Sequence, residues 1–169
     1  MKSLTREEEI LEELQKKFPK AVKEGKVQRE RRLWVTVERD SLLEVCRHLR
    51  DEMGYGHLSS VVGVDYPENF EVVYHLWSYE EKIMVSLKVP LPKDDPRVES
   101  VTGVWGAANW HERETGELFG ITFEGHPYPK RLLLADDFEG YPFRKDFKLE
   151  AKPWYGVEEE AKEGGGDKP

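Results

Sequence analysis

The sequence predicts an α+β fold: a two-layer domain in which helices pack on an antiparallel sheet, followed by an extended C-terminal segment. Three observations predict it. Apolar residues recur at helical spacing in residues 5–18 and 42–53, they alternate with polar residues in three strand-like runs within 57–89, and short loops join those runs. Because a short loop connects antiparallel neighbours, we expect the three strands to form a meander.

The first helix is predicted to begin at a capping box. Thr5 is followed three residues later by Glu8, and apolar residues then recur at helical spacing up to Pro19. A strand with one buried face is predicted at 33–37, where leucine and valine alternate with tryptophan and threonine. Together they indicate that the domain opens with one amphipathic helix and one strand.

The second helix is predicted to begin after Asp40 or Ser41, either of which can cap it, and to end at Gly54. Its apolar side includes Cys46, the single cysteine of the chain. A lone cysteine forms no internal disulfide and cannot by itself hold zinc or an iron–sulfur cluster. We therefore interpret Cys46 as a small core residue.

Three strands are predicted at 57–66, 70–79 and 82–89, and each contains the alternation or the β-branched and aromatic residues typical of strands. Pro90, Pro92 and Pro96 are expected to end the sheet, because proline cannot donate a hydrogen bond to a neighbouring strand. A short connector then leads to a third helix at 107–119.

The third helix places a carboxylate on its apolar side. Within 107–119, Ala107, Trp110, Glu114 and Leu118 fall on one arc, because side chains three, four and seven positions apart share a face. We therefore expect Glu114 in the middle of a buried stripe. A buried carboxylate needs a proton, hydrogen bonds or a cation, so an arginine or a run of backbone N–H groups should meet it.

Two further features mark this helix. Arg113 lies one turn before Glu117, and the two are expected to pair with each other. Gly120 can adopt the left-handed conformation that closes a helix.

Two near-copies of one turn follow this helix. Residues 123–130 read FEGHPYPK, and residues 138–145 read FEGYPFRK. In each copy the glycine can adopt positive φ and the proline holds the residue before it extended, which makes a rigid corner. A segment so rich in aromatics and proline cannot bury itself well. We expect it to lie over another protein, with Arg131, Arg144 and Lys145 available to acidic groups.

Composition excludes several functional classes. The net charge of −8 argues against a nucleic-acid partner. No stretch of about 18 apolar residues and no N-terminal signal pattern is present, so we expect a chain that neither spans a membrane nor is exported by the usual route. The 36% of charged residues, with only two Gln and two Asn, resembles the composition of proteins from hot environments.

The motifs after position 111 resemble, in order, the signature of the 30 kDa subunit family of respiratory complex I, also called the C subunit of NADH-quinone oxidoreductase. Membrane-bound nickel–iron hydrogenases contain close relatives. Glu117 stands where this family usually has aspartate, and Tyr141 where it commonly has histidine. The signature positions, which the resemblance assigns to structure and partner binding, are Glu112, Arg113, Glu114, Glu117, Gly120, Gly125, His126, Pro127, Arg131, Gly140, Pro142, Arg144, Lys145 and Asp146.

This resemblance implies a non-catalytic, cofactor-free subunit of a membrane-bound oxidoreductase complex that transfers electrons and pumps ions. Its expected partners are the catalytic large subunit and the iron–sulfur subunit, with the membrane subunits contacted indirectly. Iron–sulfur clusters, and a nickel–iron centre or quinone, are expected in those partners. The resemblance places the chain on the cytoplasmic side of the membrane, and the short tail and charged composition favour the hydrogenase-like branch.

We expect the chain to have three parts: an α+β docking domain at 1–97, the signature helix and an extended partner-binding segment at 98–155, and an acidic tail at 156–169. The tail is predicted to be disordered, because it holds five acidic residues, two basic residues and a run of three glycines.

A second hypothesis is a free-standing metal or acid/base enzyme that uses His111, Glu112, Glu114 and His126. His111 and Glu114 are spaced to present two ligands from one helix face. Against this, the second copy of the turn carries Tyr141 in place of His126. Tyrosine cannot replace histidine in proton transfer near neutral pH, so the shared aromatic ring favours packing.

Overall fold

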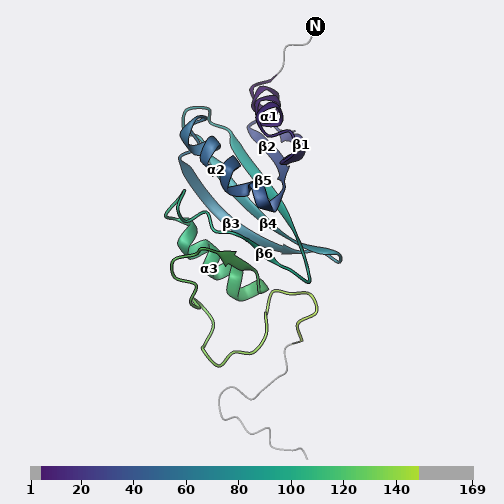
Figure 1. Cartoon of the computed structure of the whole chain (residues 1–169), viewed down its shortest axis with the longest axis vertical. Helices are drawn as coiled ribbons and strands as arrows, with labels where there is room; N and C mark the ends of the chain where they lie inside the picture. The colour runs from purple at the N-terminus through teal and green to yellow at the C-terminus, as the bar shows by residue number, and fades with distance from the viewer. Residues whose placement is uncertain (1–4, 149–169) are drawn as a thin grey trace, which may run out of the picture.

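The computed structural model describes residues 5–148 and has the α+β architecture that the sequence predicts (Figure 1). Helices α1 and α2 lie over one face of a five-stranded sheet, and α3 packs against strand β3 at the lower end of this view. The elements, with one 3₁₀ turn η1, are α1 (Arg6–Lys17), β1 (Val22–Arg29), β2 (Arg32–Val37), η1 (Arg39–Ser41), α2 (Leu42–Asp51), β3 (His57–Asp65), β4 (Asn69–Trp77), β5 (Met84–Pro92), β6 (Arg97–Glu99), α3 (Ala108–Phe119) and β7 (Thr122–Glu124).

The strands of the sheet lie in the order β1, β2, β5, β4, β3. Strands β3, β4 and β5 form the predicted antiparallel meander, and β1 and β2 form an antiparallel hairpin. Strands β2 and β5 run parallel, so the sheet is mixed rather than wholly antiparallel. Parallel neighbours need a long crossover connection, which α2, β3 and β4 supply here.

Two predictions about the strands are wrong in detail. Strand β1 was not predicted, because it is an edge strand with mostly exposed, polar side chains and no clear apolar alternation. The third strand of the meander was also predicted to end at residue 89, whereas β5 continues to Pro92, the second of the three prolines expected to end the sheet. Beyond Lys88, β5 pairs only with β4, so one side of the strand is an edge that tolerates proline.

The helix termini follow the sequence signals at α1 and differ at α2. At α1, the Thr5 hydroxyl accepts from the Glu8 amide and the Glu8 carboxylate accepts from the Thr5 amide, which confirms the capping box. At α2, neither Asp40 nor Ser41 caps the helix through its side chain, because these residues form the 3₁₀ turn that leads into it. Helix α2 ends at Asp51, three residues before the predicted end at Gly54, which has a φ of 74°.

The core lies between the sheet and the helices. Val35 of β2, Leu87 of β5 and Tyr74 of β4 are adjacent across three strands and fully buried. Cys46 of α2 is also fully buried, and burial raises the pKa of its thiol, which confirms its interpretation as a core residue. Helix α3 shares this core, and the ring of Phe119 lies against the backbone of Gly63 in β3.

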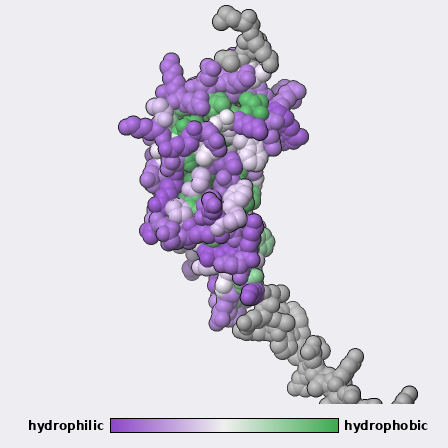
Figure 2. All heavy atoms as spheres, turned by 90° about the vertical axis from the view of Figure 1, so that its right-hand side faces the viewer, coloured by the Kyte–Doolittle hydropathy of each residue, from purple (hydrophilic) through white to green (hydrophobic). Residues whose placement is uncertain are grey.

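The surface is hydrophilic over most of the side shown in Figure 2. No helix within residues 5–148 is both long enough and apolar enough to cross a membrane. The acidic tail predicted to be disordered, residues 156–169, lies outside the described residues.

Substitution of Gly63 by alanine tests the contact between α3 and the sheet. A Cβ at this position would lie 2.6 Å from Cδ2 of Phe119, which is closer than two carbon atoms in contact can approach. We expect Gly63→Ala to lower the free energy of unfolding by about 1–3 kcal/mol through overpacking, measured by urea denaturation. Gly56→Ala is the control, because nothing lies within 4 Å of a Cβ there. Equal stability of the two variants would contradict this packing.

Candidate functional site

Helix α3 buries Glu112 rather than Glu114. Ala108, Glu112 and Thr115 face the sheet, and Glu112 is only 1% exposed. Glu114 is half-buried and Trp110 is 60% exposed, so the predicted stripe with Glu114 at its centre is wrong. The small side chains of Ala108 and Thr115 allow α3 to approach β3 closely, and this packing sets the rotation of the helix.

The Glu112 carboxylate joins α3 to the loop before it. One oxygen accepts from the Ser100 hydroxyl at 2.6 Å and the other from the Val101 amide at 2.7 Å. Burial raises the pKa of Glu112 to about 7, and the two hydrogen bonds oppose this rise. This carboxyl group therefore changes its charge near neutral pH while it lies inside the protein.

His126 fixes the first corner of the C-terminal segment, by which we mean residues 125–147. Its Nε2 lies 4.0 Å from Oε2 of Glu112 and 3.1 Å from the Asn109 carbonyl oxygen, and its Nδ1 lies 3.0 Å from the Tyr128 amide. A carbonyl only accepts and an amide N–H only donates, so these partners select the tautomer with its proton on Nε2. Both ring nitrogens therefore have a hydrogen-bond partner within the protein.

The four residues of the enzyme hypothesis do not form one cluster. Glu112 and His126 are neighbours, but His111 and Glu114 lie half-buried elsewhere on α3 and make no side-chain hydrogen bond or ion pair within residues 5–148. Across the same described range, no group of three or more His, Cys, Asp or Glu side chains is arranged to hold a metal. The geometry favours a structural role for Glu112 and His126.

Arg113 and Glu117 hold the C-terminal segment by its backbone. The Arg113 guanidinium donates to the carbonyl oxygens of residues 130 and 131 at 2.7 and 2.8 Å. The Glu117 carboxylate accepts from the amides of residues 132, 133 and 134 at 2.9, 2.6 and 3.3 Å. The predicted ion pair between Arg113 and Glu117 is therefore wrong, because each side chain binds backbone groups of the segment instead.

The far end of the segment is anchored where α3 and β3 end. Arg144 donates to the Phe119 carbonyl at 2.6 Å. The Asp65 carboxylate, whose side chain is 3% exposed, accepts from the Lys145 amide at 2.8 Å and pairs with Lys93 at 2.7 Å. Burial alone would raise the pKa of Asp65, but Lys93 and the Lys145 amide hold it below its ordinary value. Asp65 is therefore a charged anchor at neutral pH.

The prediction that Arg131 and Arg144 remain available to acidic partners is wrong. The Arg131 guanidinium donates to the Phe138 carbonyl at 2.9 Å and also to the Ala135 carbonyl, so it shapes the segment itself. Arg144 binds the end of α3. Of the three predicted cations, only Lys145 has a side chain that makes no hydrogen bond or ion pair in the part of the chain that the structure describes.

Three glycines have the positive φ that the sequence predicts. Gly125 and Gly140 form the two corners with φ of 77° and 88°, and Gly120 closes α3 with φ of 71°. A Cβ on Gly120 would also lie 2.5 Å from Nη2 of Arg144 and 2.7 Å from the Tyr141 ring. Both the conformation and the available space therefore require glycine at position 120.

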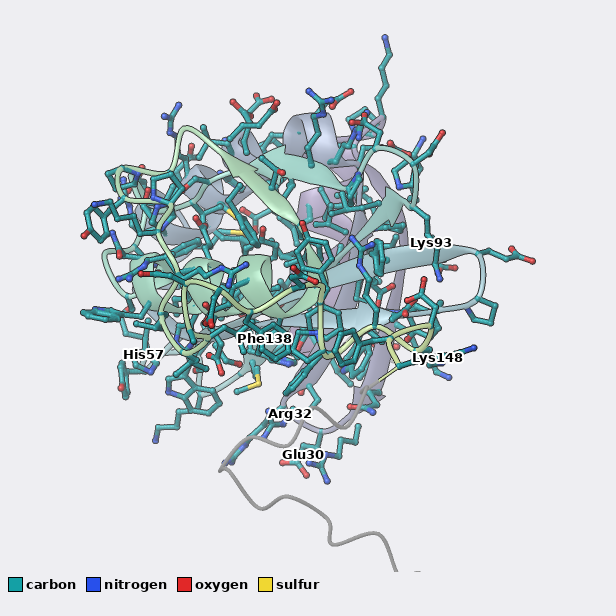
Figure 3. All side chains as sticks on the ribbon, turned by 90° about the horizontal axis from the view of Figure 1, so that it is seen from below. Glu30, Arg32, His57, Lys93, Phe138 and Lys148 are labelled. Carbon is teal, nitrogen blue, oxygen red and sulfur yellow. The ribbon has the colours of Figure 1, made fainter. Side chains whose placement is uncertain are left out.

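The anchored backbone leaves large apolar side chains in solvent. Leu133 and Phe143 are 62% and 58% exposed. The Arg113 guanidinium lies 5.1 Å from the centre of the Trp110 ring and 5.0 Å from that of Tyr128, which braces both rings. Figure 3 views this end of the molecule and labels Phe138 on the segment and Lys148 just after it. The platform, as we call the exposed set, comprises Trp110, Tyr128, Leu133, Tyr141 and Phe143.

A hollow of about 300 Å³ lies between α3, β7 and the segment. Its polar lining includes Arg113, Glu117, His126 and Arg131, and each of these already binds a backbone group of this chain. These side chains therefore need no ligand to satisfy them.

Two anchoring residues, Asp65 and Ser100, were not predicted from the sequence. Asp65 follows the apolar run at 61–64 and ends its strand, and a carboxylate in that place is a signal for a buried anchor. Ser100 begins the Ser-Val-Thr-Gly loop before α3 and carries no signal of its own, since serine is common in loops.

Loss of the Glu117 carboxylate should free the segment. Glu117→Ala removes the acceptor of three consecutive amides, so we expect the amides of residues 132–134 to exchange hydrogen at least about tenfold faster, measured by amide hydrogen exchange. Glu114→Ala is a matched control on the same helix and should leave these rates unchanged. Unchanged protection of these amides in Glu117→Ala would show that the Glu117 carboxylate does not order the segment.

Glu112 should make stability depend on pH. A carboxyl group with a pKa of 4.5 when unfolded and about 7 when folded binds its proton more tightly in the folded protein. Its contribution is complete below pH 4.5 and is lost as the pH rises to about 7, by about 3 kcal/mol in total. Between about pH 5 and about pH 8, the free energy of unfolding should therefore fall by more in the wild type than in Glu112→Gln, which has no carboxyl group at this position. An equal pH dependence in both proteins would contradict it.

Comparison with known proteins identifies the family. A family model described as the 30 Kd subunit of respiratory-chain NADH dehydrogenase matches residues 35–153. The C subunit of F(420)H(2) dehydrogenase from Methanosarcina mazei is 45% identical over 142 residues, which cover 82% of this chain and 90% of that protein. The C subunit of NADH-quinone oxidoreductase from Roseiflexus sp. is 42% identical over 148 residues, covering 85% and 84% of the two chains.

Solved structures agree with the sequence relatives. A chain in the structure of the membrane-bound sulfane sulfur reductase, an archaeal respiratory membrane complex, matches with a TM-score of 0.76 and 33% identity over 86% of this chain and 87% of that chain. A trypsin-resistant fragment of Nqo5, residues 1–134, matches with a TM-score of 0.63 and 36% identity over 73% and 99%. The chain therefore belongs to the 30 kDa subunit family of the respiratory-chain NADH dehydrogenase.

Proposed function

We propose that this chain is a peripheral subunit of a membrane-bound electron-transfer and ion-pumping complex, and that it docks and positions the catalytic large subunit. Its relatives support the subunit role, since they are named as the C subunits of F(420)H(2) dehydrogenase and of NADH-quinone oxidoreductase. In this proposal the chain lies on the cytoplasmic side of the membrane, contacts the large subunit and the iron–sulfur subunit directly, and reaches the membrane through other subunits.

One observation carries the docking role: the C-terminal segment is held by its backbone while its apolar side chains face solvent. Side chains of the folded domain, chiefly Arg113, Glu117 and Asp65, bind its carbonyls and amides. Burial of one Leu or Phe side chain is worth about 1.5–3 kcal/mol, so a partner that covers Leu133 and Phe143 gains stability. Because the segment is ordered in advance, binding loses little conformational entropy.

The cofactors in this proposal belong to the partners. One cysteine, Cys46, is too few for an iron–sulfur site, and burial keeps its thiol protonated. Iron–sulfur clusters, together with a quinone site or a nickel–iron centre, would lie in the neighbouring subunits. This chain would hold those groups at fixed separations without itself carrying electrons.

The proposal is made for complex I-like assemblies as a class. The charged composition favours a hydrogenase-like complex, whereas the similar proteins belong to two dehydrogenases and a sulfane sulfur reductase. Their shared feature is a membrane respiratory assembly, and the electron donor and acceptor would be set by other subunits.

Removal of two platform side chains should disrupt assembly without unfolding the chain. We expect Leu133→Ser combined with Phe143→Ser to reduce recovery of the large subunit by about tenfold or more, since exposed apolar anchors at an interface each contribute above about 1 kcal/mol. The measurement is gentle detergent extraction of the tagged chain, followed by quantification of co-purifying subunits. Tyr66→Ser is the control, because Tyr66 is 40% exposed but lies on the β3–β4 turn.

Metal analysis of the same preparations separates this proposal from the enzyme hypothesis. We expect iron to co-purify with the partner subunits and to be lost in the double variant along with them. A chain that is recovered alone and holds its own stoichiometric metal would overturn the proposal and return His111 and Glu112 to consideration.

A further inference from the structure

No helix within residues 5–148 covers the face of the sheet opposite α1 and α2. Its side chains alternate with those of the core and include Trp34 of β2, Trp77 of β4 and Met84 of β5, all partly exposed, while Val62 of β3 is 43% exposed. An uncovered sheet face is usually polar. Two tryptophans and a methionine on such a face suggest that another molecule contacts it.

One end of this face brings basic side chains together. Arg29 and Arg32 lie directly opposite each other on β1 and β2, an arrangement in which like charges destabilise a sheet. Within residues 5–148, no carboxylate lies within 4 Å of the charged groups of Arg29, Arg32 or Lys82. The Arg31 guanidinium lies 3.7 Å from the Glu30 carboxylate, whose side chain is 87% exposed, and the Arg31 amide donates to the buried Glu7 carboxylate at 2.6 Å. Arg29, Arg32 and Lys82 are therefore the cations of this cluster that have no ion-pair partner within the described chain.

The backbone adopts an unfavourable conformation to form this cluster. Arg31 and Lys82 have φ of 63° and 54°, and among the described residues they are the non-glycine residues with positive φ. The two turns that contain them are neighbours, because the Met84 amide donates to the Arg31 carbonyl at 3.0 Å. Positive φ is unfavourable for side chains of this kind and is more often kept where a site needs it.

Aromatic rings lie beside these cations. Arg32, Met84, Trp77 and His57 form one row across four strands. Tyr79 is 69% exposed, and the centre of its ring lies 5.6 Å from that of His57 and 6.5 Å from that of Trp77. Figure 3 shows Glu30, Arg32 and His57 on the same side of the molecule. Arginine and aromatic side chains together are typical of protein interfaces.

We propose that this basic patch is a second protein interface, separate from the platform, and that it binds a polypeptide segment of a neighbouring subunit that carries both carboxylates and apolar side chains. The patch consists of Arg29, Arg31, Arg32, Trp77, Tyr79 and Lys82.

Charge complementarity identifies the occupant. Carboxylates would relieve the repulsion between Arg29 and Arg32, and apolar side chains would cover Trp77 and Tyr79. The chain as a whole carries a net charge of −8, which opposes binding to an anionic lipid surface or to nucleic acid. This inference rests on the proposed function only in placing the chain inside a complex.

Photo-crosslinking in the intact complex identifies the occupant. A benzoylphenylalanine introduced at Tyr79 should crosslink to another subunit, in a peptide with at least about two carboxylates close to apolar residues. The same probe at Glu12, an exposed position on α1, is the control. Crosslinks only to lipid, only within this chain, or to the same peptide as the Glu12 probe would overturn the proposal.

A charge substitution gives effects of opposite sign on stability and on binding. Arg29→Gln should raise the melting temperature of the isolated full chain by about 1–3 °C, because it removes the repulsion with Arg32. In the complex it should lower the Tyr79 crosslink yield severalfold while the large subunit still co-purifies. Lys20→Gln, also an exposed basic residue, should change neither quantity. An unchanged crosslink yield in Arg29→Gln would overturn the proposal that the bound segment carries carboxylates.

The two proposals fail in different ways. Failure of the platform proposal would appear as normal recovery of the large subunit from the variant that lacks Leu133 and Phe143. Failure of the basic-patch proposal would appear as an unaltered Tyr79 crosslink in a complex that remains whole.

Discussion

The Glu117 carboxylate accepts hydrogen bonds from three consecutive backbone amides, and these bonds determine the course of the C-terminal segment. The segment has no helix or strand to satisfy its own backbone after β7, and backbone groups that are shielded from water are costly to leave without a hydrogen bond. Glu117 supplies the acceptor and Arg113, one turn earlier, supplies the donors. Because charged side chains hold the backbone, the segment's own side chains are left to face outward.

Arg113 and Glu117 can hold the segment in place only because the sheet holds α3 rigidly. Phe119 lies against Gly63, and the Thr115 hydroxyl donates to the Val61 carbonyl at 3.3 Å. Glu112, on the same face as Thr115, ties the helix to the preceding loop. Packing and one buried carboxyl group thus fix the inner face of α3, and this fixes the position of the outer face that binds the segment. The surface that the segment offers to a partner is therefore held in place by the core.

The predictable features of the fold are those that depend on local chemistry. The capping box at Thr5, the meander of β3 to β5 and the positive φ of Gly120, Gly125 and Gly140 all follow from residues close in sequence. The parallel pairing of β2 with β5 is non-local, and the charged edge strand β1 lacks apolar alternation. Neither leaves a signal in a short window of sequence.

The contacts of the candidate site were predicted wrongly. The sequence pointed to the helix with Glu112, Arg113, Glu114 and Glu117, but two overlapping arcs of that helix each contain a carboxylate, and packing against β3 selected Glu112. The partners of Arg113 and Glu117 are backbone groups, which every residue carries, so no sequence pattern marks them.

Hydroxyl-radical footprinting of the chain, free and within its complex, tests the central claim most directly. It measures the solvent accessibility of side chains, so it separates an ordered backbone from covered side chains. We predict that Leu133 and Phe143 react readily in the free chain and are protected in the complex. Equal reactivity of both side chains in the two states would contradict the claim that the anchored segment is a docking surface.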